Sequence, residues 1–490
     1  MLKPDFLTFT KLEEILQQPI QLNPNAIQKI KANRAFIEKK LAENMAIYGI
    51  TTGFGPLVNE TISKEDQIKL QYNLLQQLSC NSGPSLSIEI SKTIFMLRIH
   101  ALSQARSGIS IDLLQHMITV YNAGIYPVFR RFGSVGASGD LVPLAQLGRI
   151  LIGKDSSLTN DSKEPVQTSE LFEKHGIQQY NLKEKEGLAI VNGTTYSCGI
   201  TVFVLQKVSK LIHEELFPLI SLHWLLFNDS LQHLSEKVYQ HKAHESAQSV
   251  AKNFREWLSP IVVEQSHGVP QPPYSSRSVV LWLGSALEQI SHAQKLAETE
   301  MNSVDDNPLF FDEDDLILHA ANFQGTYIAL AADELNAGMT QIAILLERIV
   351  NRITHKSLND GLPAFLADEP LGLNSGLQGL QLLLTSLTAD LRTRAQRYSL
   401  SSIPTNADNQ DVVSMSANAA HAAHDAFERF QLVIASFKLM ILRALQLREV
   451  QVSSPKLKKW VQNEEIKIEG VYFNDPNLNY ADLLHTFIDK

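Results

Sequence analysis

The 490-residue chain contains 44% hydrophobic and 19% charged residues, which is enough apolar material for a substantial buried core. Its 43 basic and 52 acidic residues leave a net charge of −9, whereas a nucleic-acid groove would normally show as a clustered basic excess. The opening ten residues include Lys3, Pro4 and Asp5 and lack an unbroken apolar stretch, so we expect no secretory signal. Two cysteines, Cys80 and Cys198, cannot build a disulfide framework. These features predict a cytoplasmic protein that binds neither nucleic acid nor a membrane.

The strongest local signal in the chain is the glycine-rich segment 133–144, which reads GSVGASGDLVPL. It has no preceding buried strand as in a dinucleotide fingerprint, no lysine as in a phosphate loop, and no Gly-x-Ser-x-Gly order as in a nucleophile elbow. The pattern is typical of a tight turn that leads into a helix capped by Asp140. A chemical interpretation of the same residues is developed below.

A polar segment, residues 154–186, follows this turn and indicates a domain boundary. We expect an N-terminal domain over residues 1–190 and a second domain of long helices over residues 191–490. The longest apolar run, residues 217–227, is much shorter than the roughly 20 residues that a membrane-spanning helix needs. Four prolines between residues 260 and 273 indicate a loop between helices.

Long amphipathic helices dominate the remainder of the chain. Residues 279–301 have a helical composition, and apolar side chains recur every three or four residues over 328–353 and again over 427–444. Each such helix must bury its apolar stripe against neighbours. The sequence therefore predicts a mainly α-helical fold in which the second domain is a helical bundle.

Two clusters of potential metal ligands are given other interpretations. Residues 309–311 and 316–318 predict a small hairpin, and the four acidic residues between them lack the ligand spacing of a calcium loop, so we expect a solvated turn. His421 and His424 stand three residues apart, a spacing found in metal sites, but we expect them to line a contact between helices. No metal is predicted.

The chemical interpretation concerns the tripeptide Ala137-Ser138-Gly139. If a strained turn presses the Gly139 nitrogen against the Ala137 carbonyl, loss of water closes a five-membered ring, and glycine leaves this approach unobstructed. Loss of the Ser138 hydroxyl as a second water leaves an exocyclic methylene. The product, 4-methylidene-imidazol-5-one, is an electrophile made from the chain alone, without an external cofactor.

The segment 133–148 resembles the signature of the histidine, phenylalanine and tyrosine ammonia-lyases. Further segments resemble this family in the same order: 48–55 (YGITTGFG), 186–194 (EGLAIVNGT), 271–277 (QPPYSSR), 322–323 (NF) and 409–414 (NQDVVS). Together they span most of the chain, whose length fits the short bacterial type. The resemblance implies an ammonia-lyase fold with a superhelical core, and a homotetramer in which three chains build each active site.

The resemblance also implies roles for individual residues. The methylene derived from Ser138 accepts the substrate amine, and Tyr48 is the general base at the β-carbon. Arg277 holds the substrate carboxylate, because a guanidinium can bind both of its oxygens. Asn192 and Tyr274 donate hydrogen bonds to the electrophile or to nearby oxygens. Phe323 packs beside the electrophile, although ordinary core packing explains it nearly as well.

Substrate choice depends on fewer positions. Gln77 and Leu78 occupy the pair that differs between members, and the family's histidine-specific enzymes usually have a histidine in the second place and a glutamate in place of Gln410. Asn406 resembles the tyrosine pattern, and the Gln77 amide could bind a phenol hydroxyl. We therefore expect tyrosine or another ring-substituted phenylalanine, with Gln271, Asn406 and Gln410 also binding substrate.

Three alternatives remain open. The chain could be a histidine ammonia-lyase that makes urocanate, or an inactive helical assembly that keeps the fold. It could also be an aromatic aminomutase, which returns the amine to the β-carbon. The residues 280–281 (VL), where relatives usually have Pro-Gln, and Pro272, where they usually have Asp, leave this last choice open.

Overall fold

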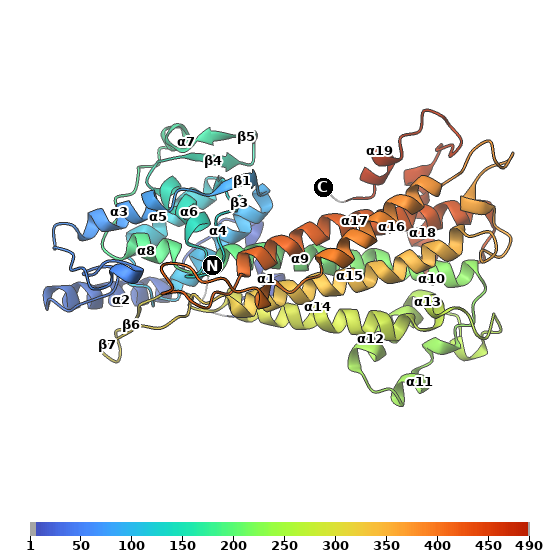
Figure 1. Cartoon of the computed structure of the whole chain (residues 1–490), viewed down its shortest axis with the longest axis horizontal. Coiled ribbons are helices and arrows are strands. Elements are labelled where there is room, and N and C mark those ends of the chain that lie inside the picture. The colour runs from blue at the N-terminus through green and yellow to red at the C-terminus, as the bar shows by residue number, and fades with distance from the viewer. Residues whose placement is uncertain (1–5, 489–490) are drawn as a thin grey trace. The chain divides into compact units, whose positions relative to one another are not determined.

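The computed structural model describes residues 6–488 and is mainly α-helical, as the sequence predicts (Figure 1). Contacts divide the chain into two compact units that differ from the expected division at residue 190. The first unit comprises residues up to Val204 together with Ala293–Asp333 and Arg397–Ala423, and the second comprises Leu205–His292, Glu334–Gln396 and His424 onward. A single boundary fails because the long helices contribute residues to both units.

The first unit holds all seven strands of the described chain and eight α-helices that lie wholly inside it. Its helices are α1 (Phe9–Leu16), α2 (Pro24–Ala42), α3 (Gln67–Gln77), α4 (Ile88–Ser103), α5 (Ile111–Asn122), α6 (Leu141–Leu151), α7 (Thr168–His175) and α8 (Glu186–Val191). Its strands are β1 (Ser82–Ser85), β2 (Ile125–Pro127), β3 (Arg130–Phe132), β4 (Ser156–Thr159), β5 (Ser162–Gln167), β6 (Leu309–Phe311) and β7 (Leu316–Leu318). The strands form three antiparallel sheets, ordered β1-β3, β2-β4-β5 and β6-β7. The polar segment expected at a boundary is thus folded as β4, β5 and α7.

The second unit is helical. It contains α10 (Phe217–Leu226), α11 (Glu236–Gln240), α12 (Glu245–Leu258), α13 (Tyr274–Arg277), α16 (Gln378–Arg394), α18 (Pro455–Glu465) and α19 (Tyr480–His485). The helices shared by both units are α9 (Thr195–Leu211), α14 (Val279–Met301), α15 (Thr326–Thr354) and α17 (Ser416–Leu447). The predicted helices at 279–301, 328–353 and 427–444 are therefore confirmed, and the proline-rich loop lies between α12 and α13.

One described helix, α17, is long and apolar enough by composition to cross a membrane. In the folded chain 72% of its most apolar window is buried. Burial of most of this window explains that composition, because side chains that face a core need not be polar.

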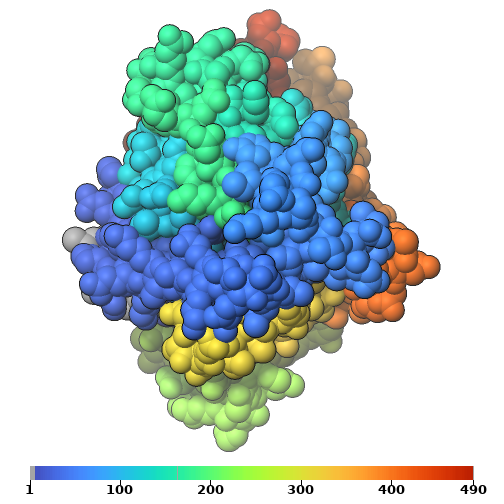
Figure 2. All heavy atoms as spheres, turned by 90° about the vertical axis from the view of Figure 1, so that its left-hand side faces the viewer, coloured from blue at the N-terminus to red at the C-terminus, as the bar shows by residue number. Residues whose placement is uncertain are grey.

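The predicted β6-β7 hairpin is present and lies beside α2, where Figure 2 shows it in yellow next to the blue N-terminal helices. Its acidic turn is solvated as expected, with Glu313, Asp314 and Asp315 exposed, and it also makes ion pairs. Glu313 accepts a 2.7 Å hydrogen bond from Arg106, and this contact lowers the pKa of Glu313 to about 2. Asp315 lies 2.8 Å from the Lys40 ammonium group. The turn therefore fastens the hairpin to the N-terminal part of the unit.

Candidate active site

The tripeptide Ala137-Ser138-Gly139 forms a tight turn between β3 and α6. Gly139 has a φ of +65°, and a Cβ there would lie only 2.2 Å from the Gly193 carbonyl oxygen. The next amide, of Asp140, donates a 2.7 Å hydrogen bond to the same oxygen. Both the backbone angle and this close approach require glycine at position 139.

Asn192 holds the central residue of the turn. It follows the last residue of α8, is 2% exposed, and directs its side-chain amide at Ser138. The amide nitrogen donates to the Ser138 carbonyl oxygen at 3.0 Å and to its hydroxyl at 3.1 Å. The donor thus lies where charge on the backbone oxygen of this residue would be stabilised.

A buried ion pair fixes the backbone around Asn192. Arg98, on α4, lies 2.8 Å from Asp305 and also donates to the carbonyl oxygens of Ala189 at 2.6 Å and Asn192 at 3.0 Å. Asp305 in turn accepts from the Thr194 amide at 2.7 Å. The sequence interpretation missed this pair, whose members are 207 residues apart. A lone arginine inside the apolar run IFMLRIHAL was the available signal, since charges are almost never buried unpaired.

The Asp140 side chain does not cap the helix as predicted, although α6 does begin at the next residue. Its carboxylate instead accepts from the Ser134 hydroxyl at 2.8 Å, and from the Ser197 amide and hydroxyl at 2.9 and 2.8 Å. Asp140 is fully buried, and this burial raises the pKa of its carboxyl group. The carboxylate therefore fastens the glycine-rich turn to the start of α9.

A second carboxyl group near the turn has a shifted pKa. Glu300 accepts a 2.5 Å hydrogen bond from the Thr194 hydroxyl, and burial raises the pKa of Glu300 to about 7. This carboxyl group can therefore change charge near neutral pH, and its partner Thr194 directly follows Gly193 in the chain.

The loop that carries Tyr48 is anchored at both sides of the tyrosine. Ile47 and Ile50 are fully buried in a cluster that includes residues of α2 and β6. Gln71, which is also fully buried, donates to the Gly49 carbonyl oxygen at 2.9 Å and accepts from the Leu188 amide at 3.0 Å. The half-buried Tyr48 hydroxyl accepts a hydrogen bond from the Gly55 amide at 2.9 Å. The backbone on both sides of Tyr48 is thus held in place by buried contacts.

A cavity of about 1160 Å³ brings most of the predicted residues together. Its lining includes the predicted residues Tyr48, Gln77, Leu78, Ala137, Ser138, Asn192, Phe323, Asn406 and Gln410. Gly139 is buried behind its neighbours and is not part of the lining. No lysine, arginine or histidine is among the described lining residues, so these walls offer no cation for a carboxylate.

The remaining three predicted residues, Gln271, Tyr274 and Arg277, belong to the second unit and do not line this cavity. Tyr274 and Arg277 are the two ends of the short helix α13, and the guanidinium lies 4.8 Å from the tyrosine ring centre. Tyr274 is 71% exposed. No carboxylate among the described residues pairs with the Arg277 guanidinium, which leaves it available to an anionic ligand.

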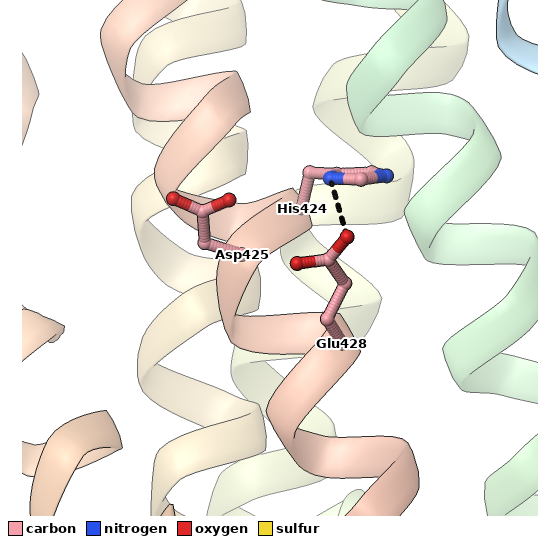
Figure 3. Close-up of side chains that lie close together, drawn as sticks. All are labelled: His424, Asp425 and Glu428. Carbon is pink, nitrogen blue, oxygen red and sulfur yellow. Dashed lines mark ion pairs between the residues drawn. The ribbon is translucent and has the colours of Figure 1, made fainter. Parts of the chain in front are cut away.

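The two histidines of α17 have separate neighbours. His421 lies 3.0 Å from the hydroxyl of Tyr196 on α9, which confirms the predicted contact between helices. His424 lies near Glu428, one turn further along, at 3.9 Å, and close to Asp425 (Figure 3). These three residues could hold an ion by distance, but they lie along one helix with Glu428 exposed, an arrangement that is common without any metal.

A helical chain with an Ala-Ser-Gly turn held by an asparagine at a large cavity has the features of an ammonia-lyase. The family model described as "Aromatic amino acid lyase" matches residues 7–464. The histidine ammonia-lyase of Legionella pneumophila (strain Corby) is 32% identical over 468 residues, which cover 94% of this chain and 92% of that relative. The chain therefore belongs to the aromatic amino acid lyase family and is a carbon–nitrogen lyase.

Solved structures agree with this assignment. Pantoea agglomerans phenylalanine aminomutase superposes with a TM-score of 0.91 at 26% identity, covering 99% of this chain and 97% of the other. Tyrosine aminomutase from Streptomyces globisporus gives a TM-score of 0.91 at 28% identity, with coverage of 99% and 95%. The fold is thus that of both ammonia-lyases and aminomutases.

Proposed function

We propose that this enzyme eliminates ammonia from an aromatic L-amino acid, with tyrosine or another ring-substituted phenylalanine favoured, to give the trans-arylacrylate. The observation that carries this proposal is the Asn192 amide placed on both oxygens of Ser138, inside a cavity that Tyr48 also lines. We place the reaction in the cytoplasm, as the composition predicts.

The turn fits the 4-methylidene-imidazol-5-one that Ala137, Ser138 and Gly139 would form. The space where a Cβ of residue 139 would lie is filled by the Gly193 backbone, which leaves no room for a side chain there. Asn192 is placed to donate to the ring's carbonyl oxygen, which derives from the Ser138 carbonyl in our assignment. When formed, the group supplies an electrophile that makes the substrate amine a better leaving group.

Tyr48 is our candidate for the base that removes the β-proton. Its loop is anchored at Ile47 and Ile50, and its hydroxyl accepts a hydrogen bond from the Gly55 amide. The glycines around it allow the loop to change conformation when substrate enters. Phe323 contributes an apolar wall to the same cavity.

Arg277 is our candidate for binding the substrate carboxylate, with Tyr274 as an additional donor. The described lining of the cavity has no cation, whereas no carboxylate among the described residues pairs with Arg277. If the α13 segment of another chain completes the active site, its Arg277 supplies the cation that the cavity lacks, and the substrate carboxylate supplies the partner that Arg277 lacks. We therefore propose a homotetramer with shared active sites, as the resemblance implies.

The preference for a ring hydroxyl rests on the cavity wall. Gln77 and Leu78 line it, and Gln77 offers an amide that could bind a phenol. Gln410, which accepts a 2.9 Å hydrogen bond from Thr405, is neutral and gives an imidazole no carboxylate. A histidine substrate remains the alternative because the curated relatives are histidine ammonia-lyases. An aminomutase outcome remains another because the solved neighbours include such enzymes.

The test is ammonia release by the purified protein from L-tyrosine, L-phenylalanine and L-histidine in parallel, with product analysis for β-amino acids. We expect release from tyrosine or phenylalanine, and release from histidine alone would contradict the proposed substrate. A β-amino acid product would identify an aminomutase.

The intact mass provides an independent check. Cyclisation removes two waters, so the wild-type chain should be lighter than its sequence mass by about 36 Da. Ser138→Ala should show neither the loss nor activity while keeping the fold. An unshifted wild-type mass would support an inactive assembly instead.

A further inference from the structure

The short helix α13, which carries Tyr274 and Arg277, is held at its middle by a buried residue. Ser276 is fully buried although Tyr274, two residues earlier, is 71% exposed. The first residue of α13 is therefore exposed, while the middle of the helix is fixed inside the second unit. The contacts of this serine explain how it is fixed.

Arg352, from the C-terminal part of α15, binds Ser276 directly. Its guanidinium donates to the Ser276 hydroxyl at 2.9 Å. The same group binds Asp229 through two hydrogen bonds of 2.6 and 2.9 Å and lies 4.0 Å from the centre of the Phe227 ring. The side chain of Asp229 is 0% exposed and that of Arg352 11% exposed, so the pair is withdrawn from solvent. A bidentate pair of this kind fixes both the position and the plane of the guanidinium.

Two further contacts hold the segment that leads to α13. The Trp224 indole donates to the Ser276 carbonyl oxygen at 3.2 Å. At the other end, the Val269 amide donates to the Asn228 carbonyl oxygen at 2.9 Å, and its own carbonyl accepts from the Ser230 amide at 3.0 Å. Residues 269–276 are thus attached at both ends to the region around Asp229.

Stability alone does not account for a buried ion pair here, because well-packed apolar side chains in its place are often as stable or more so. What the pair adds is a fixed orientation of the Arg352 guanidinium toward Ser276. We propose that Arg352, oriented by Asp229, is a positioning residue that acts through Ser276 to hold Arg277 and Tyr274 in the geometry that binds the substrate carboxylate. This inference rests on the proposed function of Arg277.

The experiment compares Ser276→Ala with Ser221→Ala as a matched control. Both serines are fully buried in the second unit, but the Ser221 hydroxyl donates only within α10, to the Phe217 carbonyl oxygen. We expect Ser276→Ala to lower kcat/KM by about tenfold, mainly through KM, since a misplacement of 1 Å can reduce rates by about 100-fold. Ser221→Ala should stay within about twofold of wild type. Arg352→Lys, which keeps the charge but loses the planar fork, should raise KM at least as much as Ser276→Ala.

Two readouts separate positioning from general damage. All variants should show the same mass loss of about 36 Da, because the cyclising turn lies in the other unit. Amide hydrogen exchange over residues 269–277 should be faster in Ser276→Ala than in Ser221→Ala. Equal KM values and equal exchange rates in the two serine variants would overturn the proposal. If the wild-type protein releases no ammonia from any substrate, the proposed function fails, and the exchange rates alone then decide whether the anchor exists.

Discussion

Gly193 is the position at which one added methyl group should separate folding from formation of the electrophile. Its φ lies outside the left-handed region, so the backbone itself permits alanine. The obstacle is the buried ion pair, because the new Cβ would lie 2.1 Å from a terminal nitrogen of Arg98 and 2.5 Å from a carboxylate oxygen of Asp305. Ordinary contact begins near 3.4 Å, so both groups must retreat by roughly an ångström.

The size of the effect follows from what that retreat breaks. Overpacking a dense core typically destabilises by about 1–3 kcal/mol. If the Arg98–Asp305 pair separates, the loss approaches the roughly 3–5 kcal/mol of a broken buried pair. The retreat also moves the Gly193 carbonyl oxygen, which accepts from the Asp140 amide. We therefore expect Gly193→Ala to be less stable and to leave most chains uncyclised.

Intact-mass spectrometry measures the cyclised fraction, and thermal unfolding at a fixed scan rate measures the stability. Gly379→Ala is the control, because Gly379 lies in α16 with nothing within 4 Å of its added Cβ. That change should stabilise the helix by up to about 1 kcal/mol. If the Gly193→Ala protein had the wild-type cyclised fraction and the wild-type midpoint of thermal unfolding, the proposed role of the Arg98–Asp305 ion pair would be refuted.

Three further predictions concern charge, the base and the substrate. Burial places the pKa of Glu300 above its unfolded value, at about 7, so the folded state binds the extra proton between pH 4.5 and 7 and loses stability as the pH rises through that range. The thermal midpoint of Glu300→Gln minus that of wild type should therefore increase from pH 5 to pH 8. A difference that stays constant with pH would contradict the raised pKa of Glu300. Tyr48→Phe should keep the loss of about 36 Da but slow turnover by about 100-fold or more, and a near-normal rate would exclude Tyr48 as the base. Gln77→His should raise the ratio of tyrosine to phenylalanine turnover by about tenfold if this side chain faces the ring, and an unchanged ratio would remove it from the substrate's surroundings.

Local patterns made the helices and the turn predictable. The apolar spacing of residues 328–353 anticipated α15 to within two residues at each end, because a periodic stripe reflects burial that any core would require. The hairpin was found for a similar reason, since its acidic turn interrupts two short apolar runs. The candidate site was proposed from short motifs, and all of them except the 271–277 motif contribute residues to one cavity.

Contacts between distant segments were not predictable in this way. Asp140 was expected to cap its own helix, but Ser197, 57 residues later, takes its carboxylate. Asp229 and Arg352 are 123 residues apart, and neither stands in a pattern that indicates a partner. The division by contacts differs from the expected boundary for the same reason, because Ala293–Asp333 and Arg397–Ala423 return to the first unit.

The separation of Arg98 and Asp305 in the sequence also determines when, during biosynthesis, their ion pair can form. A ribosome adds roughly 5–20 residues per second, so the glycine-rich turn leaves it many seconds before Asp305 does. Until then, the backbone behind the turn lacks the Arg98–Asp305 ion pair that holds it in place. The nascent enzyme should therefore remain chemically inert through about the first three-fifths of its synthesis, and a chain truncated before residue 305 should keep its full sequence mass.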